Sequence, residues 1–246
     1  MKKSAIIFAV VGLIGAPAFA ADLPVKASPP APPAAPAWTG FYVGASAGYG
    51  WSQQDVLISP LPDPLFGLPA FTANLVTHGF IGGAQAGYNF QSGSFVGGIE
   101  ADFSGSDIRG NTTVNIISFA GIQPISQKLD WFGTLRLRAG FTPIQNLLLY
   151  ATGGLAYGHT NYSSDEIYVP VQYPSSGSST NAGWTVGGGA EWLFTRNWSA
   201  KVEYLFYDLG HHTLTALPVP ALPPFFVTSR FDNTGNIVRA GVNYHF

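Results

Sequence analysis

The chain has 246 residues, of which 46% are hydrophobic and only 10% are charged, and its formal net charge is -2 at pH 7. The near-neutral charge gives no electrostatic reason to expect nucleic acid as a partner. The lack of cysteine excludes a disulfide framework and thiolate chemistry. A chain of this length can form one large all-β domain, and its low charged fraction indicates a surface short of ions.

The first twenty residues have the features of a signal peptide. Residues 2–3 are lysines, residues 4–15 are an apolar run, and residues 18–20 form a small-x-small cleavage signal. Pro17 interrupts the apolar run too early for a membrane-spanning helix, which needs about twenty residues. We therefore predict that residues 1–20 are a signal peptide that is cleaved on export.

A linker follows the predicted cleavage site. Residues 22–36 contain six prolines among alanines, a composition that favours an extended, polyproline-like conformation over a packed element. We interpret residues 21–37 as a periplasmic linker and residues 38–246 as the folded domain.

In the folded domain, an alternation of apolar and polar side chains with period two recurs eight times, as expected for strands. The eight segments are 41–51, 80–90, 95–103, 129–141, 147–158, 184–194, 198–207 and 236–246. In the last segment, Phe246, Tyr244 and Val242 share the apolar face, opposite Asn243 and Arg239. Because no apolar run after the signal is long enough to span a membrane as a helix, entry into a membrane would have to be by strands.

The connections between these segments alternate in length. The tight ones are 91–94, 142–146 and 195–197, and the long ones are 52–79, 104–128, 159–183 and 209–235. Short turns at one end and long loops at the other are typical of an outer-membrane meander. We predict an all-β fold, an eight-stranded antiparallel transmembrane β-barrel with both ends of the chain on the periplasmic side.

Size decides which face of the strands points inward. An eight-stranded barrel has an interior just wide enough to be filled by side chains, and the face that holds most Trp, Phe and Leu is too bulky for it. We therefore predict that the apolar face contacts lipid. Its aromatic residues gather at two heights, as expected for the two interfaces of a membrane.

The inward face then carries the charged side chains. These are Glu100, Asp102, Asp130, Arg136, Arg138, Glu191, Lys201, Glu203 and Arg239. Ions in a narrow lumen must pair or become neutral, because burial of an unpaired ion costs several kcal/mol. Paired ions would fill the lumen and favour a plug over an open pore.

Register allows specific pairs to be predicted. The turn at 195–197 places Glu191 directly across from Lys201, and we predict that these two side chains pair. Two further predicted pairs are Glu100 with Arg136 and Glu203 with Arg239.

The five histidines suggest either metal binding or catalysis, but none has the neighbours that such a site needs in the sequence. His211 and His212 are adjacent, so on a strand they would face opposite ways, and no Cys or acidic cluster completes a metal site. His78 and His245 have no evident partners. We predict no metal site and no cofactor, and a surface position for the adjacent pair.

An enzymatic alternative depends on His159. It lies near Ser163, Ser164, Asp165 and Glu166, and some eight-stranded outer-membrane enzymes that act on lipid A place a Ser, a His and an acid at such a rim. Proximity in sequence is not geometry, so lipid A modification is the weakest of the functional hypotheses, and we assign no catalytic residue.

Two of the long connections are unusually apolar. Residues 57–71 and 214–231 interleave Pro with Leu, Phe and Val. Exposed apolar segments indicate a partner, a lipid, or folding back over the barrel mouth. A surface partner bound through 52–79 and 209–235 and a self-packed cap both remain open.

Several motifs together resemble those of a known family. They are AFAADLP at 18–24, WTGFYVG at 38–44, WFGTLRLRAG at 131–140, GGGAEW at 187–192 and VRAGVNYHF at 238–246. In these the chain resembles the small outer-membrane immunogenic proteins of alphaproteobacteria. The resemblance implies a barrel of the OmpA type in the outer membrane of a Gram-negative bacterium, in contact with outer-membrane lipid and lipopolysaccharide. It also implies that Phe246 is the signal read by the barrel assembly machinery.

The same resemblance brings two functional labels, porin and, for some relatives, haem binding, which the residues themselves do not supply. The leading hypothesis is a structural barrel that supports envelope integrity and surface contact, with at most slight passive diffusion. The alternative is a module that binds haem or a host partner through its loops.

Overall fold

The computed structural model describes residues 38–61, 69–116, 121–167, 171–219 and 225–246. The predicted signal peptide and linker lie outside these residues. In the described part of the chain there is no helix that is long and apolar enough to cross a membrane.

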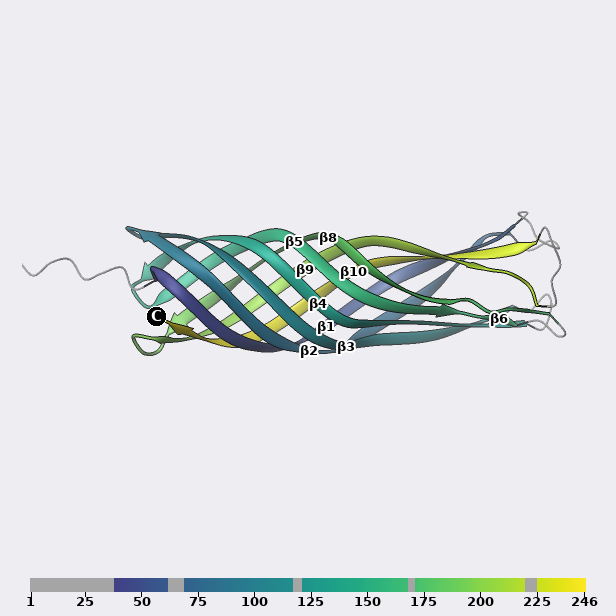
Figure 1. Ribbon diagram of the computed structural model, residues 1–246, viewed down its shortest axis with the longest axis horizontal. Coiled ribbons are helices and arrows are strands. Elements are labelled where there is room, and N and C mark those ends of the chain that lie inside the picture. Colours follow the sequence, from purple (N-terminus) through teal and green to yellow (C-terminus); the bar gives the residue numbers. More distant parts are fainter. Residues whose placement is uncertain (1–37, 62–68, 117–120, 168–170, 220–224) are drawn as a thin grey trace, which may run out of the picture. The chain divides into compact units, whose positions relative to one another are not determined.

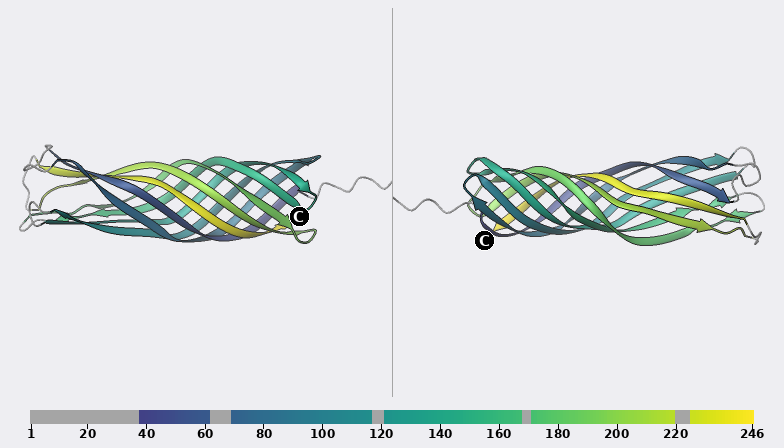
Figure 2. Two further views of the ribbon diagram at one scale, coloured as in Figure 1. Left: turned by 180° about the vertical axis from the view of Figure 1, so that it is seen from behind. Right: turned by 90° about the horizontal axis from the view of Figure 1, so that it is seen from above.

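Eight long strands form one closed antiparallel sheet (Figures 1 and 2). They are β1 (Gly40–Leu61), β2 (Phe71–Ser92), β3 (Phe95–Ile116), β4 (Gly121–Ile144), β5 (Leu147–Ser164), β8 (Ser176–Leu193), β9 (Trp198–Ala216) and β10 (Phe226–His245). Each strand pairs with its neighbours in the chain, and β1 pairs with β10 to close the ring. The predicted eight-stranded barrel is therefore confirmed.

The three tight turns lie where the sequence predicts them, but the long loops were predicted wrongly. Strand pairing continues far into the segments 52–79, 104–128, 159–183 and 209–235; β1 and β2, for example, remain paired as far as Ile58 and Phe71. Two further short strands, β6 (Glu166–Ile167) and β7 (Gln172–Tyr173), form a hairpin between β5 and β8.

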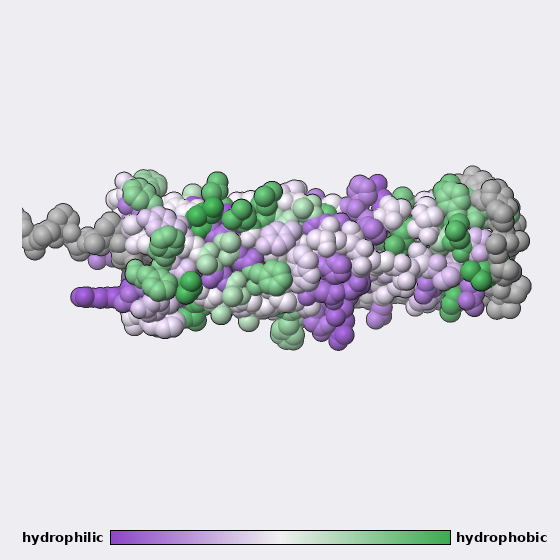
Figure 3. Space-filling view, in the orientation of Figure 1, coloured by the Kyte–Doolittle hydropathy of each residue, from purple (hydrophilic) through white to green (hydrophobic). Residues whose placement is uncertain are grey.

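The long loops were predicted wrongly because the polarity of the two strand faces reverses along the barrel. On β1 the outward side chains change from aromatic at Trp51 to polar at Gln53 and Asp55, while the inward ones become apolar at Val56 and Ile58. In Figure 3, apolar side chains gather over the half of the barrel nearer the C-terminus, beside a belt of hydrophilic ones. The first half faces lipid, and the second half has the pattern of a protein in water.

The lengths of the strands agree with this division. The long strands have 18 to 24 residues. A strand of 22 residues tilted by about 40° rises roughly 55 Å, whereas the apolar band of an outer-membrane barrel is about 25 Å tall. About half of the barrel therefore projects beyond the bilayer on the side away from the tight turns.

In this projecting half the wall divides into two four-stranded sheets. Over the described residues, the pairing of β2 with β3 ends at His78 and Arg109, and that of β8 with β9 ends at Trp184 and Asp208. One sheet consists of the upper parts of β9, β10, β1 and β2, and the other of those of β3, β4, β5 and β8.

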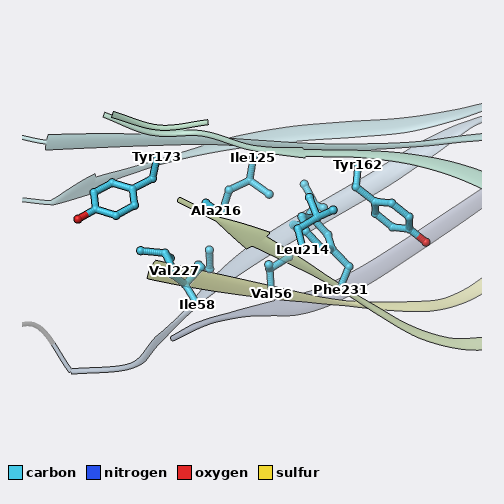
Figure 4. Packing of buried hydrophobic residues seen from close by; sticks show 11 residues of the cluster. Val56, Ile58, Ile125, Tyr162, Tyr173, Leu214, Ala216, Val227 and Phe231 are labelled. Atoms are coloured by element: carbon cyan, nitrogen blue, oxygen red, sulfur yellow. The ribbon is translucent and has the colours of Figure 1, made fainter. Parts of the chain in front are cut away.

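The two sheets enclose an apolar core, which we call the distal cluster (Figure 4). Side chains from β4, β5 and β7 point toward those from β1, β9 and β10 across the space between the sheets. The cluster consists of Val56, Ile58, Ala73, Leu75, Ile125, Tyr162, Tyr173, Leu214, Ala216, Val227 and Phe231. Some apolar residues of the segments 57–71 and 214–231, among them Ile58, Leu214 and Val227, are thus packed in this core, whereas Leu217 and Val219 are exposed.

Two more apolar clusters lie inside the barrel. The middle cluster consists of Ile81, Ile108, Leu129, Phe132, Ala156, Leu205, Tyr207, Leu209 and Ile237. The basal cluster, near the tight turns, consists of Trp38, Val96, Leu148, Tyr150 and Leu193. Along β4 the inward residues run from Ile125 through Leu129 and Phe132 to Arg136 and Arg138, so the charged residues lie between the middle and basal clusters.

Candidate functional site

Eight charged side chains, which we call the ion layer, meet inside the membrane half of the barrel. Four are acidic and four are basic, so their formal charges cancel, and each residue is at most 4% exposed. The ion layer consists of Glu100, Asp102, Glu191, Glu203, Arg136, Arg138, Lys201 and Arg239. All eight are inward members of their strands, because side chains on one face of a strand recur at every second residue.

Arg136 is the centre of one half of the ion layer. Its Nη2 contacts the Glu100 carboxylate and lies 3.1 Å from Asp102 Oδ2, and its Nη1 donates to Glu203 Oε1 at 2.9 Å. Arg239 completes this group, with Nη2 2.7 Å from Glu203 Oε2 and 3.0 Å from Asp102 Oδ2. Each guanidinium thus spans two or three carboxylates, which come from β3 and β9, as the planar fork of arginine allows.

Arg138 and Lys201 form the other half. Arg138 Nη2 donates to Glu191 Oε2 at 2.7 Å, and the guanidinium lies over the Tyr150 ring, 4.0 Å from its centroid. Lys201 Nζ contacts the two Glu100 oxygens at 3.0 Å each. Because Glu100 also contacts Arg136, it joins the two halves into one network.

Two of the three predicted ion pairs are present, Glu100 with Arg136 and Glu203 with Arg239. The third was predicted wrongly. Glu191 and Lys201 do face each other in the register of β8 and β9, but their charged groups bind Arg138 and Glu100 instead. The lumen is narrow enough for long side chains to reach across it, so the nearest backbone neighbour is not the partner.

Asp130 was also predicted wrongly, because it lies outside the lumen. A β-bulge between Leu129 and Trp131 shifts the alternation of β4 by one residue. The Asp130 side chain is 31% exposed and lies 3.1 Å from Lys128 Nζ. The same bulge turns Leu129, which the period-two pattern places on the lipid side, into the middle cluster.

Several polar neighbours of the ion layer were not predicted. Tyr42 donates from its hydroxyl to Glu100 Oε2 at 2.7 Å and accepts from Arg138 at 3.0 Å, and Tyr150 donates to Glu203 at 3.1 Å. Other neighbours that contact it are Thr134, Ser199, Asn243 and His245. The period-two alternation places these polar residues on the inward face, but a prediction that considers only charged residues leaves them out.

Glu191 of the ion layer contacts a Ser and a His beside the layer, but the geometry of these three residues is not that of a catalytic relay. Ser199 Oγ lies 2.6 Å from Glu191 Oε1 and 2.9 Å from His245 Nε2, and the same His245 nitrogen is 3.4 Å from Glu191. A relay needs the acid on the other ring nitrogen. All three residues are also buried.

Above the middle cluster, four polar residues form an amide layer. Tyr162 donates to Asn233 Oδ1 at 2.8 Å, Gln127 donates to the same oxygen at 2.9 Å, and Gln54 contacts Gln127. Burial raises the pKa of the Tyr162 hydroxyl. A cavity of about 10 Å³ adjoins this layer, which is about the volume that one water molecule needs.

Comparison with known proteins identifies the family. Residues 6–246 match a family model described as an outer membrane protein beta-barrel domain. The chain belongs to this family. It is 35% identical over 249 residues to the 31 kDa outer-membrane immunogenic protein of Brucella melitensis biotype 1, an alignment that covers 99% of this chain and 100% of the relative. It is 32% identical over 173 residues to the 22 kDa outer membrane protein of Rhizobium leguminosarum bv. viciae, over 70% of this chain and 64% of that protein.

A solved structure supports the fold of this outer membrane β-barrel protein. The crystal structure of the outer membrane protein OprG from Pseudomonas aeruginosa matches it with a TM-score of 0.55 at 12% identity, over 85% of this chain and 96% of that one. The resemblance to outer-membrane immunogenic proteins is confirmed, and the protein is an outer-membrane protein of a Gram-negative bacterium.

The His159 grouping of this outer membrane β-barrel protein is divided between the two faces of β5. His159 points outward, where it stacks on Trp131 at an interplanar angle of 11°. Ser164 points inward, 2.9 Å from Ser229. His159 and Ser164 thus lie on opposite faces of β5. Ser163 lies on the same face as His159, but its hydroxyl contacts Asp165 at 3.3 Å, whereas His159 Nδ1 contacts Thr180 at 3.0 Å. The described contacts of this grouping therefore do not join a serine to His159.

The adjacent histidines of β9 are likewise divided. His211 is exposed, whereas His212 is half-buried and stacks on Tyr162 with ring centroids 4.8 Å apart. Among the residues that the structure describes, no group of three or more His, Cys, Asp or Glu is placed to hold a metal ion.

Proposed function

We propose that the protein is a structural barrel of the outer membrane with a closed lumen, which supports envelope integrity and presents its projecting half at the cell surface. The observation that carries the proposal is the ion layer. Its four acids and four bases have no net formal charge, and the basal and middle clusters flank it. A neutral, paired layer between two apolar ones offers a passing ion neither a charge to bind nor a continuous wet path.

The proposal is tested by conductance. Purified protein, shown to be folded by heat-dependent gel migration, would be placed in planar bilayers beside a general porin as a positive control. We expect no stable channel, and we expect vesicles that contain the protein to retain small sugars. Conductance steps of the size that the porin gives would overturn the closed lumen.

The structural role has a separate test in cells. We expect a strain that lacks the gene to take up more of a hydrophobic dye and to become more sensitive to detergent, and expression of the wild-type protein to reverse both effects. Dye uptake and detergent sensitivity unchanged by the deletion would contradict a role in envelope integrity.

A second candidate is binding of a partner or of haem at the distal end. The observation that favours it is a group of exposed apolar side chains there, with Leu217 65% and Val219 58% exposed. A haem titration of the wild type and of a variant with His211→Ala and His212→Ala tests the haem form. Equal affinity in the two proteins would remove this histidine pair from the proposal.

We also propose that Phe246 is the signal read by the barrel assembly machinery. The residue is 73% exposed, and its backbone N–H donates to the Phe41 carbonyl at 3.0 Å, which fixes the end of β10 against β1. We expect Phe246→Ala to reduce the amount of folded protein in the outer membrane while the purified variant still refolds in detergent. Normal assembly of the variant in cells would exclude this role.

A further inference from the structure

A groove of about 410 Å³ lies on the outer wall of the barrel between β2 and β3. Tyr49, Val76 and Phe80 give it an apolar side, and His78, Arg109 and Asn111 give it a polar side. The groove begins where the backbone pairing of β2 with β3 ends, at His78 and Arg109. It therefore joins the lipid-facing half of the wall to the half that projects into water.

Its aromatic residues fix its depth in the membrane. Tyr49 and Phe80 belong to the aromatic girdle at the end of the lipid-facing half away from the tight turns, and they contact each other, with ring centroids 5.4 Å apart. Girdles of this kind lie at the head-group level of a membrane. In the orientation that the proposed function assumes, this level is the outer leaflet, whose characteristic lipid in a Gram-negative bacterium is a phosphorylated glycolipid.

The polar side of the groove carries a guanidinium that is available to a ligand. The Arg109 side chain is 67% exposed, and its ion contact with Asp107 Oδ2 is long at 3.5 Å. Exposed pairs of this kind are weak, so most of the five N–H donors of Arg109 remain open to a second acceptor. His78, the cross-strand partner of Arg109, adds a ring nitrogen beside it.

A second cation lies next to Arg109. Lys128 on β4 is its cross-strand partner on the other side, and the Lys128 side chain is 44% exposed beside Asp130. In the described parts of the chain, the remaining arginines and lysines are the four of the ion layer together with Arg196 and Arg230. The wall across β2, β3 and β4 thus holds two of the four basic residues that lie outside the lumen in the described part of the chain.

We propose that this groove binds the phosphorylated head group of an outer-leaflet glycolipid. Arg109 is the principal phosphate ligand, because its planar fork can donate two parallel hydrogen bonds to phosphate oxygens. His78 adds a donor, and Val76 and Phe80 contact the apolar part of the lipid. Asp107 opposes binding, since its carboxylate competes for Arg109 and repels the phosphate.

The test uses the full-length folded protein in detergent and counts bound lipid by native mass spectrometry. The probes are lipid A with two phosphates, the same lipid A after removal of its phosphates, and inorganic phosphate as a competitor. Arg109→Gln should weaken binding of the phosphorylated lipid about tenfold or more, as expected for loss of a charge-assisted hydrogen bond. Asp107→Asn should strengthen it.

A matched control exists on β10. Arg230 is also an exposed arginine, 51% exposed at its side chain and 3.7 Å from Asp232, but it does not line the groove. Arg230→Gln should therefore leave binding unchanged. Heat-dependent gel migration checks that every variant is folded.

Three results would overturn the proposal. They are equal binding by Arg109→Gln and the wild type, equal binding of the two forms of lipid A, and complete displacement of the lipid by inorganic phosphate at a concentration equal to that of the lipid. The proposed function fails separately, through channel conductance, which does not depend on this groove.

Discussion

Glu191 and Lys201 face each other across β8 and β9, yet each forms its ion contacts with residues of other strands. Glu191 binds Arg138 at 2.7 Å, and Lys201 binds Glu100 at 3.0 Å. Cross-strand position therefore does not determine pairing in this lumen. Eight ions share one narrow section, and each selects among several partners within reach of its side chain.

This arrangement predicts which side chains are energetically coupled. In a double-mutant cycle, we expect Glu191→Gln and Arg138→Gln to show a coupling free energy of about 2 kcal/mol, within the range for directly bonded residues. The cycle of Glu191→Gln with Lys201→Met should give a much smaller value. Denaturant unfolding in lipid vesicles, followed by tryptophan fluorescence, measures both, and equal coupling in the two cycles would contradict the observed contacts.

Truncation of a side chain in the middle cluster should destabilise the protein without opening a channel. Phe132 is fully buried there, and Phe132→Ala should lower the free energy of unfolding by about 3 to 5 kcal/mol through lost burial and the cavity that remains. The ion layer would still cross the lumen, so the variant should not conduct. Planar-bilayer recording beside unfolding in vesicles checks both statements, and an open channel in this variant would assign the closure to the middle cluster instead.

The reversal of polarity along the strands predicts a position-dependent cost of charge. Leu135 and Ser126 both lie on the outer face of β4, the first in the lipid-facing half and the second in the projecting half. Leu135→Arg should lower the free energy of unfolding by about 2 to 4 kcal/mol, as expected near the bilayer midplane. Ser126→Arg should change it by less than about 0.5 kcal/mol. Similar losses at the two positions would mean that the bilayer boundary is misplaced.

The pairing of β9 with β10 shifts register beside Gly210, between Asp208 and His211, and this irregularity predicts an effect of backbone conformation alone. Gly210 has a φ of 73°, and a Cβ built there meets no atom within 4 Å, so Gly210→Ala should cost about 1 to 2 kcal/mol purely from the left-handed conformation. Gly105 is also open around its Cβ position but has no positive φ. Gly105→Ala is therefore the control and should be close to neutral. Thermal unfolding of the two variants would show the contrast, which equal melting temperatures would contradict.

The sequence was sufficient for the barrel because period two is a property of the backbone itself. Six of the eight predicted segments lie within a strand, and the other two, 184–194 and 236–246, extend one residue past the ends of β8 and β10. The inward position of Glu100, Arg136 and Arg239 follows from the period-two alternation. The upper halves of the strands escaped prediction because apolar residues such as Val56 move to the inner face once the solvent outside is water. If the outward face is expected to be apolar along the whole strand, the upper part of β1 does not match the strand pattern and is predicted to be an apolar loop.

The errors at single residues have local causes. Asp130 was misplaced because a bulge adds one residue without changing the composition of β4. Lys201 was given the wrong partner because register locates Cα atoms, whereas its ammonium lies several bonds away and can reach Glu100 across the lumen. Neither a bulge nor the reach of a long side chain leaves a mark in the order of residues.

The projecting sheets also determine what an antibody can recognise on an intact cell. Only every second residue of each strand is accessible there, so Gln53 and Asp55 are exposed while the Gln54 between them is buried. Asn74 lies opposite Asp55 on β2, and its side chain contacts that of Asp55 at 3.3 Å. The exposed neighbour of Asp55 is therefore a residue of another strand, because the next residue in the chain, Val56, points inward. Epitopes on this half are therefore assembled across neighbouring strands, and serum raised against linear peptides of β1 or β2 would bind the denatured chain in preference to living cells.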